Sequence, residues 1–162
     1  MSAKRIRLLV IGLVVAVAAG LLLYPSDEKK VRAVMEAIVE GANQDQMALG
    51  QALVEHAVDD VTVSISDLLP QPLVGREAIV GAATRSEIAG RKLRFRMQAV
   101  EISVEGGNAR VNAELVASLS LGIRQLSQAR SGVAILQKID GRFKLVSIDV
   151  GAERHDQPEA RP

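Results

Sequence analysis

The sequence predicts an α+β domain in which helices come first and an antiparallel sheet follows. Apolar residues recur with helical spacing over residues 31–39, whereas from residue 93 onward they occupy every second position. Gly106-Gly107 and Asp140-Gly141 each separate two such alternating runs, as expected of hairpin turns. The later strands are therefore expected to pair as antiparallel neighbours and to pack against the helices.

Three helices are expected before the sheet. Ser26 or Asp27 can cap the first, whose apolar face consists of Val31, Val34, Met35, Ile38 and Val39. Gly41 and Asn43 suit the end of this helix. The second helix is expected over residues 46–57 and the third over residues 76–89, with a half-buried strand at residues 61–65 between them.

From residue 91 onward every expected element is a strand. Apolar positions alternate over residues 93–97 and then, with the opposite parity, over residues 100–104, so we expect a β-bulge near residues 98 and 99. The remaining strands are expected at residues 109–121, 131–138 and 142–150. The positions predicted to face inward are Leu93, Phe95, Met97, Val100, Ile102, Val104, Val111, Ala113, Leu115, Val133 and Ile135.

The N-terminus predicts a membrane anchor. Lys4, Arg5 and Arg7 precede an uncharged, mostly apolar run over residues 8–24, which ends at Pro25. Seventeen residues lie at the short end of what spans a bilayer as a helix, roughly 17 to 25 residues. Because positive flanks resist translocation, the N-terminus is expected in the cytoplasm. The globular part would then be exported to the periplasm or the cell exterior, held at the cytoplasmic membrane by a single span.

A cleaved signal peptide is the alternative for the same segment. Ala16-Val17-Ala18 fits the small-x-small cleavage pattern. Cleavage there would leave an apolar stub, residues 21–24, on an exported protein, which favours the uncleaved anchor. Gly12, Ala16 and Gly20 form a small-xxx-small stripe that would let two anchors pack closely, so a homodimer is one expectation.

We therefore divide the chain into a cytoplasmic start and anchor at 1–25, one domain at 26–150 and a disordered tail at 151–162. Without Lys4, Arg5 and Arg7, 17 basic residues remain against 19 acidic ones, which gives no general attraction to nucleic acid. The chain has no cysteine and only two histidines, far apart. No metal or other cofactor is expected.

Two short motifs carry a resemblance to a known family. Gly75-Arg76-Glu77-Ala78-Ile79 follows a proline-containing loop, and Asp140-Gly141-Arg142-Phe143-Lys144-Leu145 forms the expected last hairpin. Together with the order of elements, they resemble the nuclear-transport-factor-2-like superfamily, in particular its SnoaL-like branch. The resemblance implies a cone-shaped, cystatin-like fold in which a curved sheet wraps a long helix, often around a pocket. Members include isomerases, dehydratases and non-catalytic assembly modules, so it implies no single activity.

The candidate chemical groups are few. Family enzymes are implied to use an acid or base in the pocket, and here His56, with Asp60 nearby in sequence, is the candidate. A solvated histidine at a helix end is the competing interpretation. A pocket, if one exists, would be lined by Leu93, Phe95, Met97, Val111 and Leu115. Such a lining suits a small apolar ligand or a filled core.

Lys92, Arg94 and Arg96 share one face of their strand and form a basic ladder. The ladder would face an acidic partner or anionic headgroups, or else solvent. The leading functional hypothesis is a membrane-anchored, exported, non-enzymatic interaction domain in a cell-envelope assembly. The alternative is an exported SnoaL-like enzyme of the isomerase or dehydratase type, or a carrier of a small apolar ligand.

Overall fold

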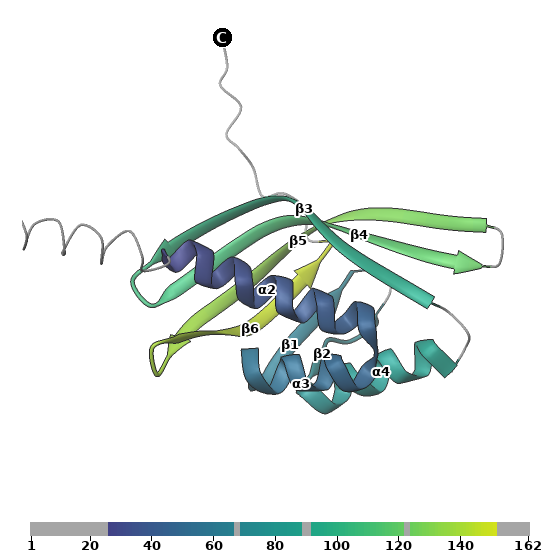
Figure 1. Cartoon of the computed structure of the whole chain (residues 1–162), viewed down its shortest axis with the longest axis horizontal. Helices are drawn as coiled ribbons and strands as arrows, with labels where there is room; N and C mark the ends of the chain where they lie inside the picture. Colours follow the sequence, from purple (N-terminus) through teal and green to yellow (C-terminus); the bar gives the residue numbers. More distant parts are fainter. Residues whose placement is uncertain (1–25, 67–68, 89–91, 122–123, 152–162) are drawn as a thin grey trace, which may run out of the picture.

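The computed structural model describes residues 26–66, 69–88, 92–121 and 124–151, which form three helices and six strands. Figure 1 shows the helices on one side of a long, curved sheet. The elements in chain order are α2 (Asp27–Gln44), α3 (Gln46–His56), β1 (Ala57–Ile65), β2 (Leu73–Val74), α4 (Arg76–Ile88), β3 (Lys92–Glu105), β4 (Asn108–Leu121), β5 (Arg124–Ile139) and β6 (Arg142–Val150). The predicted α+β class is confirmed.

The six strands form one sheet in the order β2-β1-β6-β5-β4-β3. Strands β3 to β6 make the expected antiparallel meander, and β2 pairs antiparallel with β1. Strand β1, however, pairs with β6 in parallel. The chain leaves β1 through β2 and α4 and starts the meander at the far edge of the sheet, so its last strand returns beside β1. The edge at the β3 side carries no further strand within the described part of the chain.

Helix α2 supplies most of the helical contribution to the core. Ser26 caps it by accepting a hydrogen bond from the Lys29 backbone N–H at 3.3 Å, as expected of an N-cap serine. The apolar face lies against the concave side of the sheet, where α2 is seen in Figure 1. The core residues that are at most 2% exposed are Val31, Leu53, Ala57, Val61, Ala109, Val111, Leu136 and Leu145.

Of the two residues predicted at the end of the first helix, Asn43 lies next to the last residue of α2, whereas Gly41 lies inside the helix. Helix α2 continues past Gly41 to Gln44, and Asp45 then caps α3 by accepting from the Ala48 N–H at 2.8 Å. A Cβ at Gly41 would lie 2.9 Å from the Ala48 carbonyl oxygen. Gly41 therefore permits the close approach of α3 rather than ending a helix.

The register confirms the predicted bulge and corrects one strand. Pairing between β3 and β4 shifts between Gln98 and Glu101, and Ala99 adopts a φ of 50°. In β5, Val133 pairs with Asn112 and Ile135 with Arg110, which puts both on the face opposite the core. The inward positions of this strand are instead Arg130, Gly132, Ala134 and Leu136. Apolar residues occur on both faces of β5, so alternation alone did not identify the buried face.

None of the helices in the described part of the chain is both long and apolar enough to cross a membrane. The predicted anchor at residues 8–24, with its packing positions Gly12, Ala16 and Gly20, lies outside the described residues. The same is true of nearly all of the predicted tail, since the described part ends at residue 151.

Candidate functional site

An open groove runs between α2 and β3 and has a volume of about 460 Å³. Helix α2 contributes one stripe of side chains with helical spacing, namely Arg32, Glu36, Val39, Glu40, Asn43 and Gln44. Strand β3 contributes the residues on either side of its bulge, namely Phe95, Arg96, Met97 and Val100. The groove therefore lies beside the edge of the sheet and not inside the cone.

Asn43 joins the two walls of the groove. Its side-chain N–H donates to the Phe95 carbonyl oxygen at 2.7 Å, and its side-chain oxygen accepts from the Phe95 backbone N–H at 2.7 Å. These two backbone groups therefore point away from β4, toward the free edge of the sheet. The Asn43 carboxamide satisfies both of them, as a peptide group of a neighbouring strand would.

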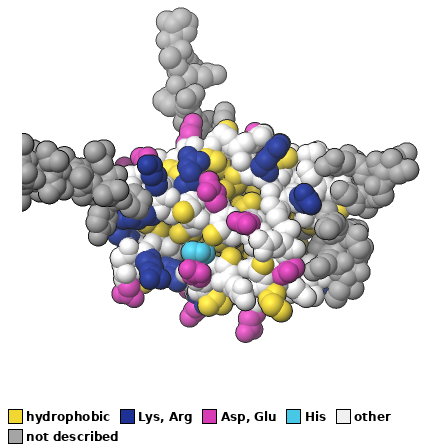
Figure 2. All heavy atoms as spheres, in the orientation of Figure 1, with side chains coloured by type: hydrophobic (Ala, Val, Ile, Leu, Met, Phe, Trp, Pro, Cys, Tyr) yellow, Lys and Arg dark blue, Asp and Glu magenta, His cyan; other side chains and the backbone are white. Residues whose placement is uncertain are grey.

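The walls of the groove combine apolar and charged groups. Val39, Phe95, Met97 and Val100 are half-buried and form its apolar surface. Arg32, Glu36, Glu40 and Arg96 are all exposed, and they supply two positive and two negative charges. Figure 2 shows the same mixture over this view of the molecule, with acidic and basic side chains interspersed among apolar ones.

Of the five residues predicted to line a pocket, only two line the groove. Phe95 and Met97 line the groove, whereas Val111 is 1% exposed and belongs to the packed core. Leu93 and Leu115 are half-buried on the same face of the sheet, and neither lines the groove. The groove obtains the rest of its lining from α2.

His56 and Asp60 are not brought together as an acid–base pair in the described structure. The His56 side chain at the end of α3 is 25% exposed, and its Nε2 lies 3.9 Å from a carboxylate oxygen of Glu55. Asp60 is exposed on β1. The neighbouring Asp59 is paired with Arg76 at 2.6 Å and is 93% exposed. A catalytic role for His56 and Asp60 stays a prediction without a geometric arrangement that supports it.

Arg94 and Arg96 lie on the face of β3 away from the core, opposite Ser118 and Val116 of β4. Both are exposed, and Arg96 also reaches the groove. Lys92 belongs to β3, but its side chain lies outside the described residues. Glu114 hydrogen-bonds Gln98 at 2.8 Å and forms no ion pair with either arginine. The basic ladder therefore stays a predicted interaction surface.

The motif that begins at Gly75 has a structural task. Gly75 adopts a φ of +88° and its N–H donates to the Val61 carbonyl oxygen at 2.9 Å. The Arg76 guanidinium donates to the Ala57 carbonyl oxygen and pairs with Asp59. These contacts fasten the start of α4 to β1. The glycine is needed because a positive φ is costly for other residues.

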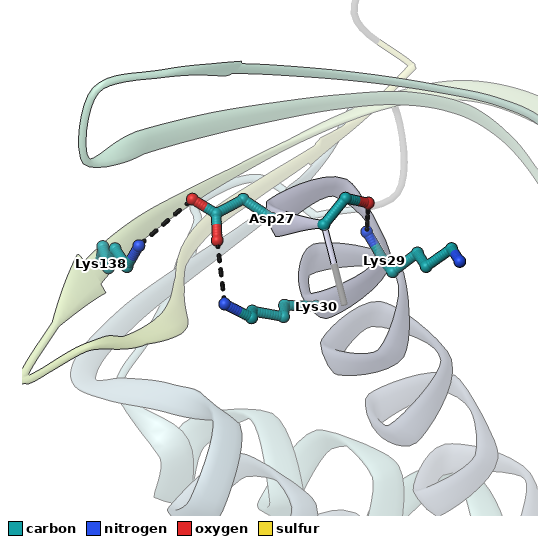
Figure 3. Close-up of polar contacts among 5 residues, drawn as sticks. Asp27, Lys29, Lys30 and Lys138 are labelled. Carbon is teal, nitrogen blue, oxygen red and sulfur yellow. Dashed lines mark hydrogen bonds and ion pairs between the residues drawn. The ribbon is translucent and has the colours of Figure 1, made fainter. Parts of the chain in front are cut away.

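At the start of α2, Asp27 links the helix to β5 (Figure 3). Its carboxylate lies 3.2 Å from the ammonium groups of both Lys30 and Lys138. A hydrogen bond from Lys30, which has the larger effect, and another from Lys138 lower the pKa of Asp27 from its ordinary value of 3.8. Lys138 also lies 5.4 Å from the centre of the Phe143 ring, so one lysine connects α2, β5 and β6.

Within the described residues, no polar or charged side chain is buried in the core, and no cluster of histidine, aspartate or glutamate has the spacing to hold a metal ion. The sequence analysis missed Asn43 as a site residue, because asparagine near a helix end is typical of a helix stop. It also missed the charged stripe of α2, since residues 32, 36 and 40 resemble any solvated helical face.

Neither family models nor curated proteins match this sequence. Solved structures do match. An NTF2-like protein with a cystatin-like fold from Novosphingobium aromaticivorans superposes with a TM-score of 0.67 at 16% identity, over 88% of this chain and 90% of that one. An NTF2-like protein from Cytophaga hutchinsonii gives a TM-score of 0.62 at 12% identity, over 78% of this chain and 98% of that one.

A proposed dehydratase of the NTF2-like family from Streptomyces avermitilis also matches, with a TM-score of 0.62 at 18% identity, over 77% of this chain and 94% of that one. Identities this low establish the fold alone. The chain therefore has the nuclear-transport-factor-2-like, cystatin-like α+β fold, with helices on a curved and mainly antiparallel sheet. Because this fold hosts unrelated activities, the functional conclusion has to come from the site.

Proposed function

We propose that this chain is a membrane-anchored, exported interaction domain of a cell-envelope assembly, and that it acts by binding rather than by catalysis. The observation that carries the binding role is the groove between α2 and β3. It places an apolar surface next to the free edge of a sheet, and its four charged side chains are exposed. Those features suit the recognition of another molecule, whereas acid–base catalysis needs a carboxyl or imidazole held away from water.

The anchor and the export of the domain are supported by the sequence alone. An uncharged run over residues 8–24 follows a basic start, and residues 26–150 would project from the far side of the membrane. The link between the two is short, because α2 begins at Asp27. The domain would therefore be held close to the bilayer, where envelope assemblies are built.

A carrier of a small apolar ligand is the second candidate, and one observation favours it. Val39, Phe95, Met97 and Val100 give the groove an apolar surface that a small hydrophobic molecule could contact. An exported enzyme of the isomerase or dehydratase type has less support, since the His56 side chain is 25% exposed and Asp60 is exposed.

Co-purification from membranes in mild detergent tests the proposal. The full-length chain is compared with a chain that starts at Ser26, both tagged at the C-terminus. We expect a defined set of envelope proteins to be recovered with the full-length chain, and the same set to be recovered when one of those proteins carries the tag instead. Recovery of both chains without partners would overturn the proposal. A small molecule retained by the shorter chain in native mass spectrometry would then favour the carrier.

A further inference from the structure

We propose that the groove binds a short extended peptide segment of a partner protein, which adds to the free edge of β3 as an extra strand. This inference rests on the proposed function, because it names the surface through which an interaction domain would recognise its partner. The group that the groove recognises is then the peptide backbone of the partner.

The first support is the direction of the backbone groups of β3. Strand β3 is the outermost strand of the sheet, and β4 is its sheet neighbour. The bonds to Asn43 show that the N–H and C=O of Phe95 point away from β4. Backbone groups in a strand alternate in direction, so those of Met97, two residues further along, point to the same free edge. No described side chain hydrogen-bonds to them, and Met97 lines the groove.

The second support is the chemistry of Asn43. Its carboxamide has the donor and the acceptor of a peptide group, and it binds Phe95 through both at 2.7 Å. At the free edge, the Asn43 amide thus already makes the two hydrogen bonds that a residue of a neighbouring strand would make with Phe95. A partner's backbone placed next to Asn43 would meet the corresponding pair of groups on Met97. This observation favours a peptide over an apolar small molecule, which could not make these bonds.

The bulge limits the length of the bound segment, and the apolar surface of the groove indicates the kind of side chain it carries. The register of β3 shifts between Gln98 and Glu101, so a continuous ladder cannot extend past Met97 in that direction. The segment is therefore short. Val39, Met97 and Val100 offer it a half-buried apolar surface, so at least one of its side chains should be apolar.

The charges around the groove predict how binding depends on salt. Arg32 and Arg96 are balanced by Glu36 and Glu40, and all four side chains are exposed. The groove therefore has no net charge with which to attract a strongly acidic or basic segment. We expect affinity to change less than about threefold between 50 and 500 mM salt, because the surface charges that salt screens cancel here.

The probe is a phage-displayed library of random twelve-residue peptides, selected against the chain that starts at Ser26. Enriched peptides are synthesised, and binding is followed by shifts of backbone amide signals in nuclear magnetic resonance spectra. Each peptide is also made with single N-methylated backbone positions, which remove one donor and leave the side chains unchanged. We expect shifts centred on Met97 and Val100, and a loss of affinity of tenfold or more at one or two N-methylated positions.

Two exposed acidic residues of α2 provide matched variants. Glu36→Trp places a bulky ring in the groove, whereas Glu28→Trp makes the same change outside it. We expect Glu36→Trp to weaken peptide binding at least tenfold and Glu28→Trp to change it less than twofold. The inference is overturned if no peptide is enriched, if bound peptides tolerate every N-methylation, or if the two variants behave alike.

The outcome separates this inference from the proposed function. Failure of the peptide experiments, with envelope partners still recovered by the full-length chain, would place the interaction on another surface, such as the basic ladder. If the peptide experiments succeed and no envelope partners are recovered, the chain is a peptide-binding domain and the proposed role in an envelope assembly is overturned.

Discussion

Asn43 is the residue on which the candidate site depends most directly. Its carboxamide supplies two hydrogen bonds of 2.7 Å to the backbone of Phe95, 52 positions away in the chain. Both residues are half-buried. A backbone N–H and C=O that lack partners in a half-buried position cost more free energy than the same groups would in water. The side chain therefore couples α2 to the edge of the sheet and defines one end of the groove.

Asn43→Ala should lower the free energy of unfolding by about 1 to 3 kcal/mol, because it leaves two backbone groups of Phe95 unsatisfied. Urea denaturation followed by far-ultraviolet circular dichroism measures the change. The matched control is Gln44→Ala, which removes only an exposed bond to Glu40 and should cost less than about 0.5 kcal/mol. Equal effects of the two substitutions would show that the bonds to Phe95 do not stabilise the fold.

Asp27 predicts a pH dependence of stability with a definite sign. The pKa of Asp27 is lowered in the folded chain by hydrogen bonds from Lys30 and Lys138. A lowered pKa contributes stability that is present above the unfolded value of 3.8 and is lost as pH falls through the folded value. We therefore expect Asp27→Asn to have a lower urea midpoint than the unchanged protein at pH 7, and the difference to vanish as pH falls well below 3.8.

The control for Asp27 is Glu28→Gln, which removes one acid from the same first turn of α2. Glu28 forms no ion pair with another described residue. Its substitution should therefore give a smaller change in midpoint at pH 7. A difference between Asp27→Asn and the unchanged protein that persisted undiminished at low pH would contradict the electrostatic explanation.

Among the elements, β3 combines the features that position the site. It is an edge strand, it carries the bulge, and its residues on either side of the bulge line the groove. A bulge increases twist and bends a strand. Figure 1 shows β3 as a long, bent strand that passes beside α2. The backbone strain of this bend falls on Ala99, with its φ of 50°.

Ala99→Gly should stabilise the fold by up to about 1 kcal/mol, because glycine adopts a positive φ without the steric cost that alanine incurs. Ala33→Gly is the matched control, since Ala33 is exposed in the middle of α2 and glycine there should cost about 1 kcal/mol. Alanine-to-glycine substitution should thus raise the free energy of unfolding at position 99 and lower it at position 33. Urea midpoints measure both, and a destabilised Ala99→Gly would mean that the bulge is not strained.

In the molecule as a whole, one core joins the helices to the concave side of the sheet. Every buried hydrophobic residue of the described structure lies between Val31 and Val150. The buried residues of the core come from α2, α3 and four of the strands, so neither the helices nor the sheet could bury its apolar face alone.

A chain restricted to residues 26–151 should therefore fold by itself and unfold in one cooperative transition. We expect its urea midpoint to equal that of a chain of residues 26–162 within experimental error. Circular dichroism is the suitable measurement, because the chain has no tryptophan and its single tyrosine precedes residue 26. A lower midpoint for the shorter chain would mean that residues 152–162 contribute to the folded core.

Much of the fold was predictable because it depends on local patterns. Helical spacing at residues 31–39 located α2, and the change of parity near residue 98 located the bulge. The turn glycines at 106 and 141 located the connection between β3 and β4 and the one between β5 and β6. The apolar spacing, the turn residues and the caps act over a few neighbouring positions, so they can be recognised without knowing the tertiary structure.

The sequence by itself therefore determined the α+β class, the meander and the apolar character of the core. Only the tertiary structure decided the parallel pairing of β1 with β6, the buried face of β5 and the position of the groove. Those features depend on contacts between residues far apart in the chain. Asn43 and Phe95 become a site only when α2 lies along the edge of the sheet, and no local pattern encodes that approach.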